Sequence, residues 1–447
     1  MRKSPSHPAA PPDPATHSPL SLEVLPVGPE HRAVVGTWSR LPAELKHQVV
    51  DDVLEAVVGD SDTGGWLDPP VGFFEEIADS EHSAQDADKR KRCELARLQA
   101  VARDFRSICR LKLWQHVDLD PYRHEDLDTL LGALPFIAPT VRRIAYKDII
   151  KHVNWRRQQR ASYLDWRVRA LEVLKRCTAV QTLVLSESLA DLSGGALARL
   201  NTLYLDKRDL SGADLAIIYE QRALTSLSLA FHQIDSAGDG FIFDLVASMP
   251  NLKHLAVEGR NALCTQRIEK LLCVPADVAV AARLESLELV VEAYKVSFAA
   301  VHSFLALFSS SLVSLRLGLR GFAYDRWTVD PALPHIHLPH LTSLAVGGDF
   351  ASTFFLHLDL PSLSFFRLDL FPTLRHDADD LISFLEAHSA TLERVHLSTD
   401  AVSRERHVDG HYNEREVSDE VIDAAERACG EIGCEMSCGE RGEEPEE

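Results

Sequence analysis

The sequence lacks the short motifs by which many catalytic sites are recognised. Its 447 residues contain no G-x-x-x-x-G-K-[ST] phosphate loop, no G-x-S-x-G nucleophile elbow, no H-E-x-x-H zinc motif and no Rossmann glycine fingerprint. The series His335-x-His337-x-x-His340 has no acidic or thiol neighbour that would complete a tetrahedral metal site. We therefore expect a protein that is not an enzyme and that needs neither a cofactor nor a metal ion.

Long apolar runs, paired cysteines and an excess of positive charge are also lacking. No run approaches the roughly 18 apolar residues that cross a bilayer, and the N-terminal residues do not resemble a signal peptide. The eight cysteines form no C-x-x-C pair, which favours reduced thiols. The net charge is −20, of which −11 lies in residues 400–447. These features predict an intracellular protein, cytoplasmic, nuclear or both, without a nucleic-acid or membrane partner.

What the sequence does contain is one apolar phrase that recurs ten times. Each copy has an apolar residue, two others, a second apolar residue, one other and a third apolar residue. The copies begin about every 28 residues, a period that predicts an array of stacked units. They are Val141/Ile144/Tyr146, Val180/Leu183/Leu185, Leu200/Leu203/Leu205, Leu224/Leu227/Leu229, Leu252/Leu255/Val257, Leu284/Leu287/Leu289, Leu312/Leu315/Leu317, Leu341/Leu344/Val346, Leu363/Phe366/Leu368 and Leu392/Val395/Leu397.

Each copy of the phrase predicts a short strand. Its second and third apolar residues lie two apart, so on an extended backbone both point to the same face. Apolar residues at intervals of three and four predict helices between the phrases, at residues 163–175, 212–221, 239–248, 267–272, 299–308 and 377–388. One such unit cannot bury its apolar faces alone, so neighbouring units must stack. The sequence therefore predicts an α/β solenoid with parallel strands on its concave face and helices outside.

The phrase resembles the ribonuclease-inhibitor type of leucine-rich repeat, whose arrays form a horseshoe. That family places Asn or Cys three residues after the phrase, where the side chain bonds the backbone of the turn. This sequence has other residues there, namely Ser188, Arg208, His232, Arg260, Glu292, Arg320, Asp349, Phe371 and Asp400. The missing asparagine leads us to expect irregular turns and uneven curvature.

The remaining residues divide into further segments. Residues 1–37 are rich in proline and residues 439–447 are acidic, so we expect both to be disordered. Residues 38–119 contain two helical apolar patterns, separated by an insertion at residues 59–92. The repeat domain follows at residues 120–438. We expect it to end with a helix capped at Ser418 and a final strand within residues 433–438.

The helical domain carries a recognisable sequence. Leu41-Pro42-Ala43-Glu44-Leu45 lies in its first half, Val101-Ala102-Arg103-Asp104-Phe105 in its second half, and Leu113-Trp114 near its end. This arrangement resembles an F-box. F-box proteins are the substrate receptors of SCF-type cullin-RING ubiquitin ligases, so the resemblance implies a Skp-type adaptor and a cullin-RING ligase as partners. The insertion and the altered Cys-Arg-x-Trp pattern of the second helix depart from the family.

The resemblance assigns the adaptor contacts to apolar residues of both halves. They are Leu41, Pro42, Leu45, Val49, Val50, Val101, Phe105, Ile108 and Trp114. The alternative is that these residues only pack a helical cap over the end of the array, because a solenoid end must be covered. The protein would then be a repeat scaffold with a degenerate F-box that takes no part in ubiquitination.

A receptor would hold its protein substrate on strand residues that point away from the core. The candidates are Tyr204, Glu258, Glu288, Arg316, Arg367 and Arg394, together with Asp206, His254, Asp369 and His396. The three arginines suggest a patch for an acidic or phosphorylated segment. The alternative for each of these residues is an ordinary solvated position on a strand.

Overall fold

The computed structural model describes most of the repeat region and little of the chain before it. The described residues are 45, 112, 114–119, 124–146, 157–192, 197–234, 240–267, 272, 283–295, 298–321, 335–348, 357–369, 378–398 and 419–438. The expected segments 1–37, 59–92 and 439–447 therefore lie outside them.

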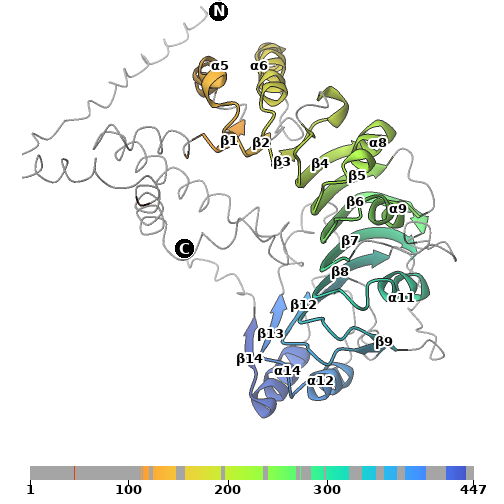
Figure 1. The fold of residues 1–447 in the computed structure, drawn as a ribbon. Coiled ribbons are helices and arrows are strands. Elements are labelled where there is room, and N and C mark those ends of the chain that lie inside the picture. The colour runs from red at the N-terminus through yellow and green to blue at the C-terminus, as the bar shows by residue number, and fades with distance from the viewer. Residues whose placement is uncertain are drawn as a thin grey trace, which may run out of the picture.

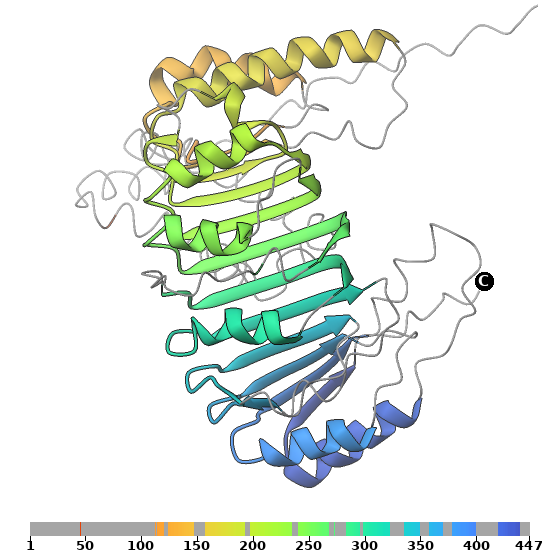
Figure 2. The same cartoon turned by 90° about the vertical axis from the view of Figure 1, so that its right-hand side faces the viewer.

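One parallel sheet of twelve strands runs through the described residues and curves into an arc (Figures 1 and 2). Its strands follow one another in chain order, as expected for a solenoid. They are β1 (His116–Leu119), β2 (Arg143–Tyr146), β3 (Thr182–Leu185), β4 (Thr202–Leu210), β5 (Ser226–Ile234), β6 (His254–Arg267), β7 (Ser286–Lys295), β8 (Ser314–Gly321), β10 (Ser343–Gly348), β12 (Phe365–Asp369), β13 (Arg394–Ser398) and β14 (Glu435–Cys438).

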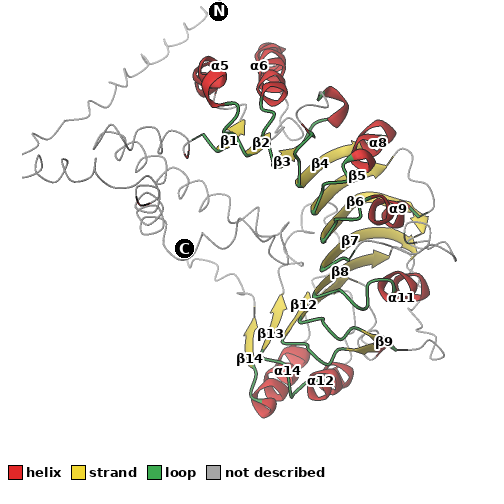
Figure 3. Cartoon of the chain, viewed as in Figure 1, coloured by secondary structure: helices red, strands yellow, loops and turns green. Residues whose placement is uncertain are grey.

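The described helices lie on the outer side of the arc, and the strands line its inner side (Figure 3). The helices are α5 (His124–Ile137), α6 (Arg157–Arg176), the short 3-10 helix η2 (Leu189–Asp191), α8 (Gly212–Glu220), α9 (Phe241–Ser248), α11 (Phe298–Ala306), α12 (Ala378–Ala387) and α14 (Asp419–Ile432). The predicted α/β architecture, with parallel strands inside and helices outside, is confirmed for this part of the chain.

The core lies between the sheet and the helices, and the repeated phrase builds it. Ile144, Leu183 and Leu203 pair in register across β2, β3 and β4, and each is at most 2% exposed. The same register continues strand by strand to Val395 and Met436. All ten predicted phrases therefore form strands of one sheet.

A repeated backbone contact joins consecutive units where their strands begin. The Gln115 carbonyl accepts the N–H groups of both Arg142, at 2.8 Å, and Arg143, at 3.0 Å. The same contact recurs at the carbonyls of Arg142, Gln181, Asn201, Thr225, Lys253, Glu285, Val313, Thr342 and Ser364. Because it requires no particular side chain, this contact holds the register of units that lack the family's asparagine.

The helices predicted at residues 212–221, 239–248, 299–308 and 377–388 are observed as α8, α9, α11 and α12. The helix expected after Ser418 is α14, and the final strand is β14. One prediction needs correction, because Arg267 ends strand β6 instead of beginning a helix. The residues from 268 to 271 lie outside the described part of the chain.

Two further features differ from the sequence analysis. Strand β1 pairs with β2, so the sheet already includes His116–Leu119, which we had placed in the helical domain. Strands β9 (Ile336–His337) and β11 (Leu358–Asp359) form a separate two-stranded parallel sheet on the outer side of the arc. They occupy the outer layer between β8 and β12, whereas the other connections that the structure describes contain helices there.

Candidate functional site

The inner face of the sheet, which we call the concave face, is the candidate binding surface. Its residues line up in columns across the strands. The first column contains His116, Arg143, Thr182, Thr202, Ser226, His254, Ser286, Ser314, Ser343, Phe365, Arg394 and Glu435. The second column contains Asp118, Ala145, Val184, Tyr204, Ser228, Ala256, Glu288, Arg316, Ala345, Arg367, His396 and Ser437. Adjacent strands lie about 4.8 Å apart, so an extended ligand crossing them would meet the accessible members of these columns. Six members are buried and would not be met directly, namely Ala145, Ser226, Ser228, Glu288, Arg316 and Ala345.

The strand register places the six predicted substrate-contacting residues on this face. Tyr204, Glu288, Arg316 and Arg367 belong to the second column, and Arg394 belongs to the first. Glu258 lies two residues beyond the second column on β6. The period-two alternation of the strands is therefore a sufficient guide to which residues share the concave face.

The expectation that Glu288 and Arg316 are exposed is corrected by the structure. The two residues are paired in register on β7 and β8, and only 7% and 5% of their surfaces are exposed. An Arg316 guanidinium nitrogen lies 3.2 Å from a Glu288 carboxylate oxygen. Buried opposite charges need such a partner, so the two side chains neutralise each other and are withdrawn from direct contact with a ligand.

The three predicted arginines do not form one open patch. Arg316 is buried, Arg367 is half-buried, and Ala345 stands between them in the column. Arg394 is exposed, and its guanidinium carbon lies 5.5 Å from the centre of the Phe365 ring, a cation–π distance. Arg394 is therefore the one exposed member of the three, and the exposed Glu435 lies next to it in the first column.

Tyr204 is a half-buried residue in the second column of the concave face. Burial raises the pKa of its hydroxyl above the ordinary value, against smaller opposing effects of a hydrogen bond with Ser226 and of the Arg143 charge. The hydroxyl is therefore neutral at physiological pH. It can donate or accept a hydrogen bond, as recognition of a peptide requires.

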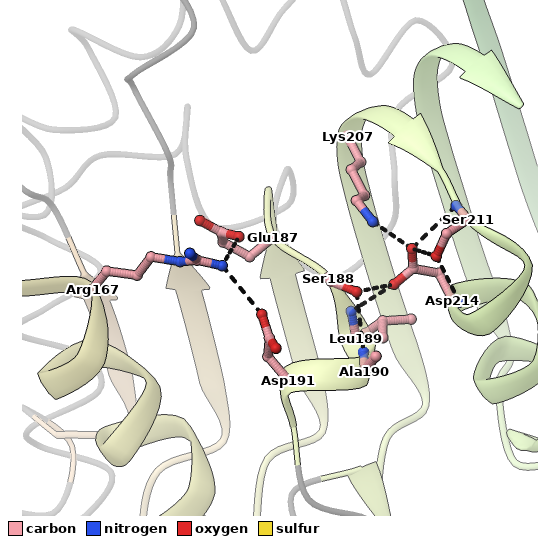
Figure 4. A network of polar contacts seen from close by, with 9 residues as sticks. All are labelled: Arg167, Glu187, Ser188, Leu189, Ala190, Asp191, Lys207, Ser211 and Asp214. Carbon is pink, nitrogen blue, oxygen red and sulfur yellow. Dashed lines mark hydrogen bonds and ion pairs between the residues drawn. The ribbon is translucent and has the colours of Figure 1, made fainter. Parts of the chain in front are cut away.

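A polar network that the sequence analysis did not anticipate lies where β3 and β4 end (Figure 4). The Asp214 carboxylate is fully buried and accepts hydrogen bonds from Ser188 Oγ at 2.7 Å, the Leu189 amide at 2.8 Å and Lys207 Nζ at 2.5 Å. It also accepts bonds from the Oγ and the amide of Ser211, the residue that caps α8. One carboxylate thus links two successive repeats and the start of a helix.

Burial alone would raise the pKa of Asp214. The hydrogen bonds from Lys207, Ser211 and Ser188 and the Lys207 charge outweigh this effect and lower the pKa to about 2. Both carboxylate oxygens are occupied by these donors, which is typical of a structural carboxylate and not of a catalytic base. The Asp214 carboxylate accepts the Leu189 amide and Ser188 Oγ accepts the Ala190 amide, so side chains satisfy the backbone of the turn after β3.

A second ion-pair group lies beside the first in the same view (Figure 4). Arg167 on α6 contacts a Glu187 oxygen at 2.7 Å and an Asp191 oxygen at 3.2 Å. Glu187 and Asp191 flank Ser188, so the two groups together fasten α6, η2 and α8. Their spacing in the sequence gives no periodic signal that could have identified them.

Of the predicted adaptor contacts, the structure describes Leu45 and Trp114. Leu45 is 45% exposed. Trp114 is half-buried and packs against the core of the repeats. Leu41, Pro42, Val49, Val50, Val101, Phe105 and Ile108 lie outside the described residues.

Two members of the histidine series contact other residues of the outer layer. His337 Nδ1 lies 2.6 Å from an Asp359 carboxylate oxygen, an acidic partner that the sequence analysis did not find because it lies 22 residues away. The His335 ring lies opposite the His357 ring, with 5.4 Å between the ring centres. Within the described residues, no group of three or more His, Cys, Asp or Glu side chains is arranged to hold a metal ion.

Comparison with known proteins does not assign the chain to a family. Neither a protein-family model nor a curated protein matches the sequence. Among the helices that the structure describes, none is long and apolar enough to cross a membrane.

Proposed function

We propose that this protein is a non-catalytic substrate receptor of an SCF-type ubiquitin ligase. In this proposal, apolar residues within the segment 38–114 bind a Skp-type adaptor, and the concave face holds a protein substrate. The observation that carries the proposal is the continuous sheet. All the described helices lie on its outer side, so none of them covers its inner face (Figure 3). A surface formed by side chains in register, beside a segment that resembles an F-box, supports a receptor.

The junction between the two parts supports a receptor that works by proximity. Trp114 packs against the repeat core, and β1 begins two residues later as the first strand of the sheet. A residue assigned to adaptor contact is thus joined to the array without a flexible linker. A ligase that grips this end would hold a bound substrate at a defined distance, which raises its effective concentration at the ubiquitin-transferring enzyme.

The packing of Trp114 also favours the alternative function. If its role is to cover the first repeat, residues 38–119 serve as a cap and the protein is an interaction scaffold outside ubiquitination. Under this alternative the concave face still binds a protein, but no Skp-type adaptor binds the N-terminal region.

Co-purification with a Skp-type adaptor distinguishes the two functions. We expect the full-length protein to retain the adaptor and the Leu41→Ala, Pro42→Ala double variant to lose it. Leu164→Ala is the matched control, because Leu164 is a half-exposed leucine on the outer side of α6. It should retain the adaptor. Failure of the folded wild-type protein to bind would contradict the receptor and favour the scaffold.

A further inference from the structure

The last helix and the last strand of the array meet at a tight turn with a cysteine on each side. Cys429 lies in the final turn of α14, and Cys434 directly precedes β14. Gly433 between them has a φ of 78°, a left-handed conformation that favours glycine. The Cys429 carbonyl accepts the N–H of Gly433 at 2.9 Å and that of Cys434 at 3.1 Å.

This hydrogen-bond pattern brings the two thiols together. A bond from the residue after a left-handed glycine to a carbonyl five residues earlier belongs to the Schellman type of helix end, in which those two side chains contact each other. Here the two residues are Cys434 and Cys429, so the turn places their side chains next to each other, and the neighbouring Cys434 contributes to a raised pKa of Cys429. Cys429 is only 1% exposed, whereas Cys434 is half-buried. A reagent can therefore reach the Cys434 thiol, whereas the Cys429 thiol is buried.

We propose that Cys429 and Cys434 form a reversible dithiol–disulfide pair that locks the C-terminal end of the array. The co-reactant is a small disulfide of the glutathione class. This inference is independent of the proposed function, since it concerns how the last unit is fastened and not what the concave face binds.

The exchange takes place in two balanced steps. The Cys434 thiolate attacks one sulfur of the small disulfide, a mixed disulfide forms, and the first small thiolate leaves. Cys429 then loses its proton to solvent and attacks the Cys434 sulfur, so the protein disulfide forms and the second small thiolate leaves. The two cysteines lose two electrons, and the small disulfide gains them as it becomes two thiols.

The order of the steps follows from the surroundings of each thiol. Burial, together with the neighbouring Cys434, raises the pKa of Cys429 to about 12, so Cys429 is a poor first nucleophile. Cys434 reacts first because a reagent can reach it. Cys429 closes the bond because its sulfur is already adjacent, which replaces a collision between molecules by an intramolecular step.

The bond would fasten α14 to β14. Strand β14 pairs only with β13 among the described strands, and α14 packs against α12. Among the described units, the one formed by α14 and β14 thus has a neighbour on one side only, and we expect it to open more readily than units flanked on both sides. A cross-link at the turn limits this opening.

The test treats the folded full-length protein with oxidised glutathione, blocks the remaining thiols and maps the peptides by mass spectrometry. We expect a Cys429–Cys434 disulfide, seen as a loss of about 2 Da relative to the reduced peptide, which dithiothreitol reverses. We also expect the oxidised protein to unfold at a higher temperature than the reduced protein. A stable glutathione adduct on Cys434, no reaction at either residue, or pairing of Cys434 with another cysteine would overturn the proposal.

Matched variants keep the test decisive. Cys429→Ala should stop the reaction at the glutathione adduct on Cys434, and Cys434→Ser should remove both products. Cys177→Ala is the control, because Cys177 is a buried cysteine in a different repeat. It should leave the cross-link and the temperature shift unchanged. Equal temperature shifts in wild type and Cys434→Ser would also refute the locking role.

Discussion

At the scale of single residues, Asp214 carries an unusual share of the contacts between repeats. Its carboxylate receives bonds from Ser188 and Leu189 beside η2, from Lys207 on β4 and from Ser211 at the start of α8. A buried charge is stable only with such partners. The side chain therefore fixes the relative positions of elements that belong to successive units.

Replacing Asp214 should destabilise the array. We expect Asp214→Ala to lower the free energy of unfolding by about 3 kcal/mol, because Lys207, Ser188 and the Leu189 amide lose their acceptor. Urea denaturation followed by circular dichroism measures the change. Asp209→Ala is the matched control, since Asp209 is exposed on β4, and it should change stability by less than about 0.5 kcal/mol.

The same carboxylate predicts a pH dependence. Its pKa is lowered from 3.8 to about 2 on folding. The carboxylate therefore contributes fully to the free energy of unfolding when the pH is above its unfolded pKa, and this contribution is lost as the pH falls through its folded pKa. We expect the stability difference between wild type and Asp214→Asn to shrink by about 2 kcal/mol on acidification from about pH 6 to about pH 2. A difference that stays constant over this range would show that Asp214 is not held ionised by its partners.

The Glu288–Arg316 pair gives a third residue-scale prediction. Arg316→Met leaves the buried Glu288 carboxylate without this cation, so we expect a loss of about 3 kcal/mol. Adding Glu288→Leu removes the remaining charge and should restore much of the stability. Denaturation of the single and double variants tests this expectation. A double variant no more stable than Arg316→Met would contradict the idea that charge burial governs this position.

At the scale of elements, the sequence predicted the strands and helices that recur in each repeat, and it did not predict the elements that occur only once. The strands were predictable because the second and third apolar residues of every phrase must face the same core. Strands β9 and β11 were not, because a two-residue strand carries no period. Helix α6 begins at Arg157, six residues before the helix predicted at residues 163–175, because the long spacing between the first two phrases had indicated an insertion there.

The same distinction holds for the candidate site. Strand alternation predicted which side chains share the concave face. It could not predict that Glu288 and Arg316 would neutralise each other, because the two residues lie 28 positions apart and meet only through the register of β7 and β8. The Asp214 network likewise depends on contacts between units, which single-unit patterns do not encode.

The end of α14 predicts opposite effects for two glycines, Gly430 within the helix and Gly433 directly after it. Gly433→Ala forces alanine into a left-handed conformation and should cost about 1 kcal/mol. Gly430→Ala lies within α14 with open space around its added methyl group, and it should stabilise the protein by up to about 1 kcal/mol. Thermal denaturation of both variants measures the two signs. Equal effects would show that the backbone conformation at Gly433 does not decide the outcome.

At the scale of the whole molecule, the repeats stack on one another and build one elongated core in place of a compact one. Every phrase adds three apolar residues to a continuous layer, and the strand starts of the sheet from β2 to β13 each donate two amides to a carbonyl of the preceding unit. Contacts are therefore made mainly between neighbouring units, as in other solenoids. The result is a curved frame whose described strands place their concave side chains in register from one repeat to the next.

The most direct test of this account is hydrogen–deuterium exchange of the full-length protein with and without a Skp-type adaptor. The receptor account predicts slower exchange in peptides covering residues 41–50 and 101–114 when the adaptor is present, and unchanged exchange in the strands from β4 to β13. Unchanged exchange throughout, or protection confined to the concave strands, would contradict it. Either of those results would leave residues 38–119 as a cap of a repeat scaffold.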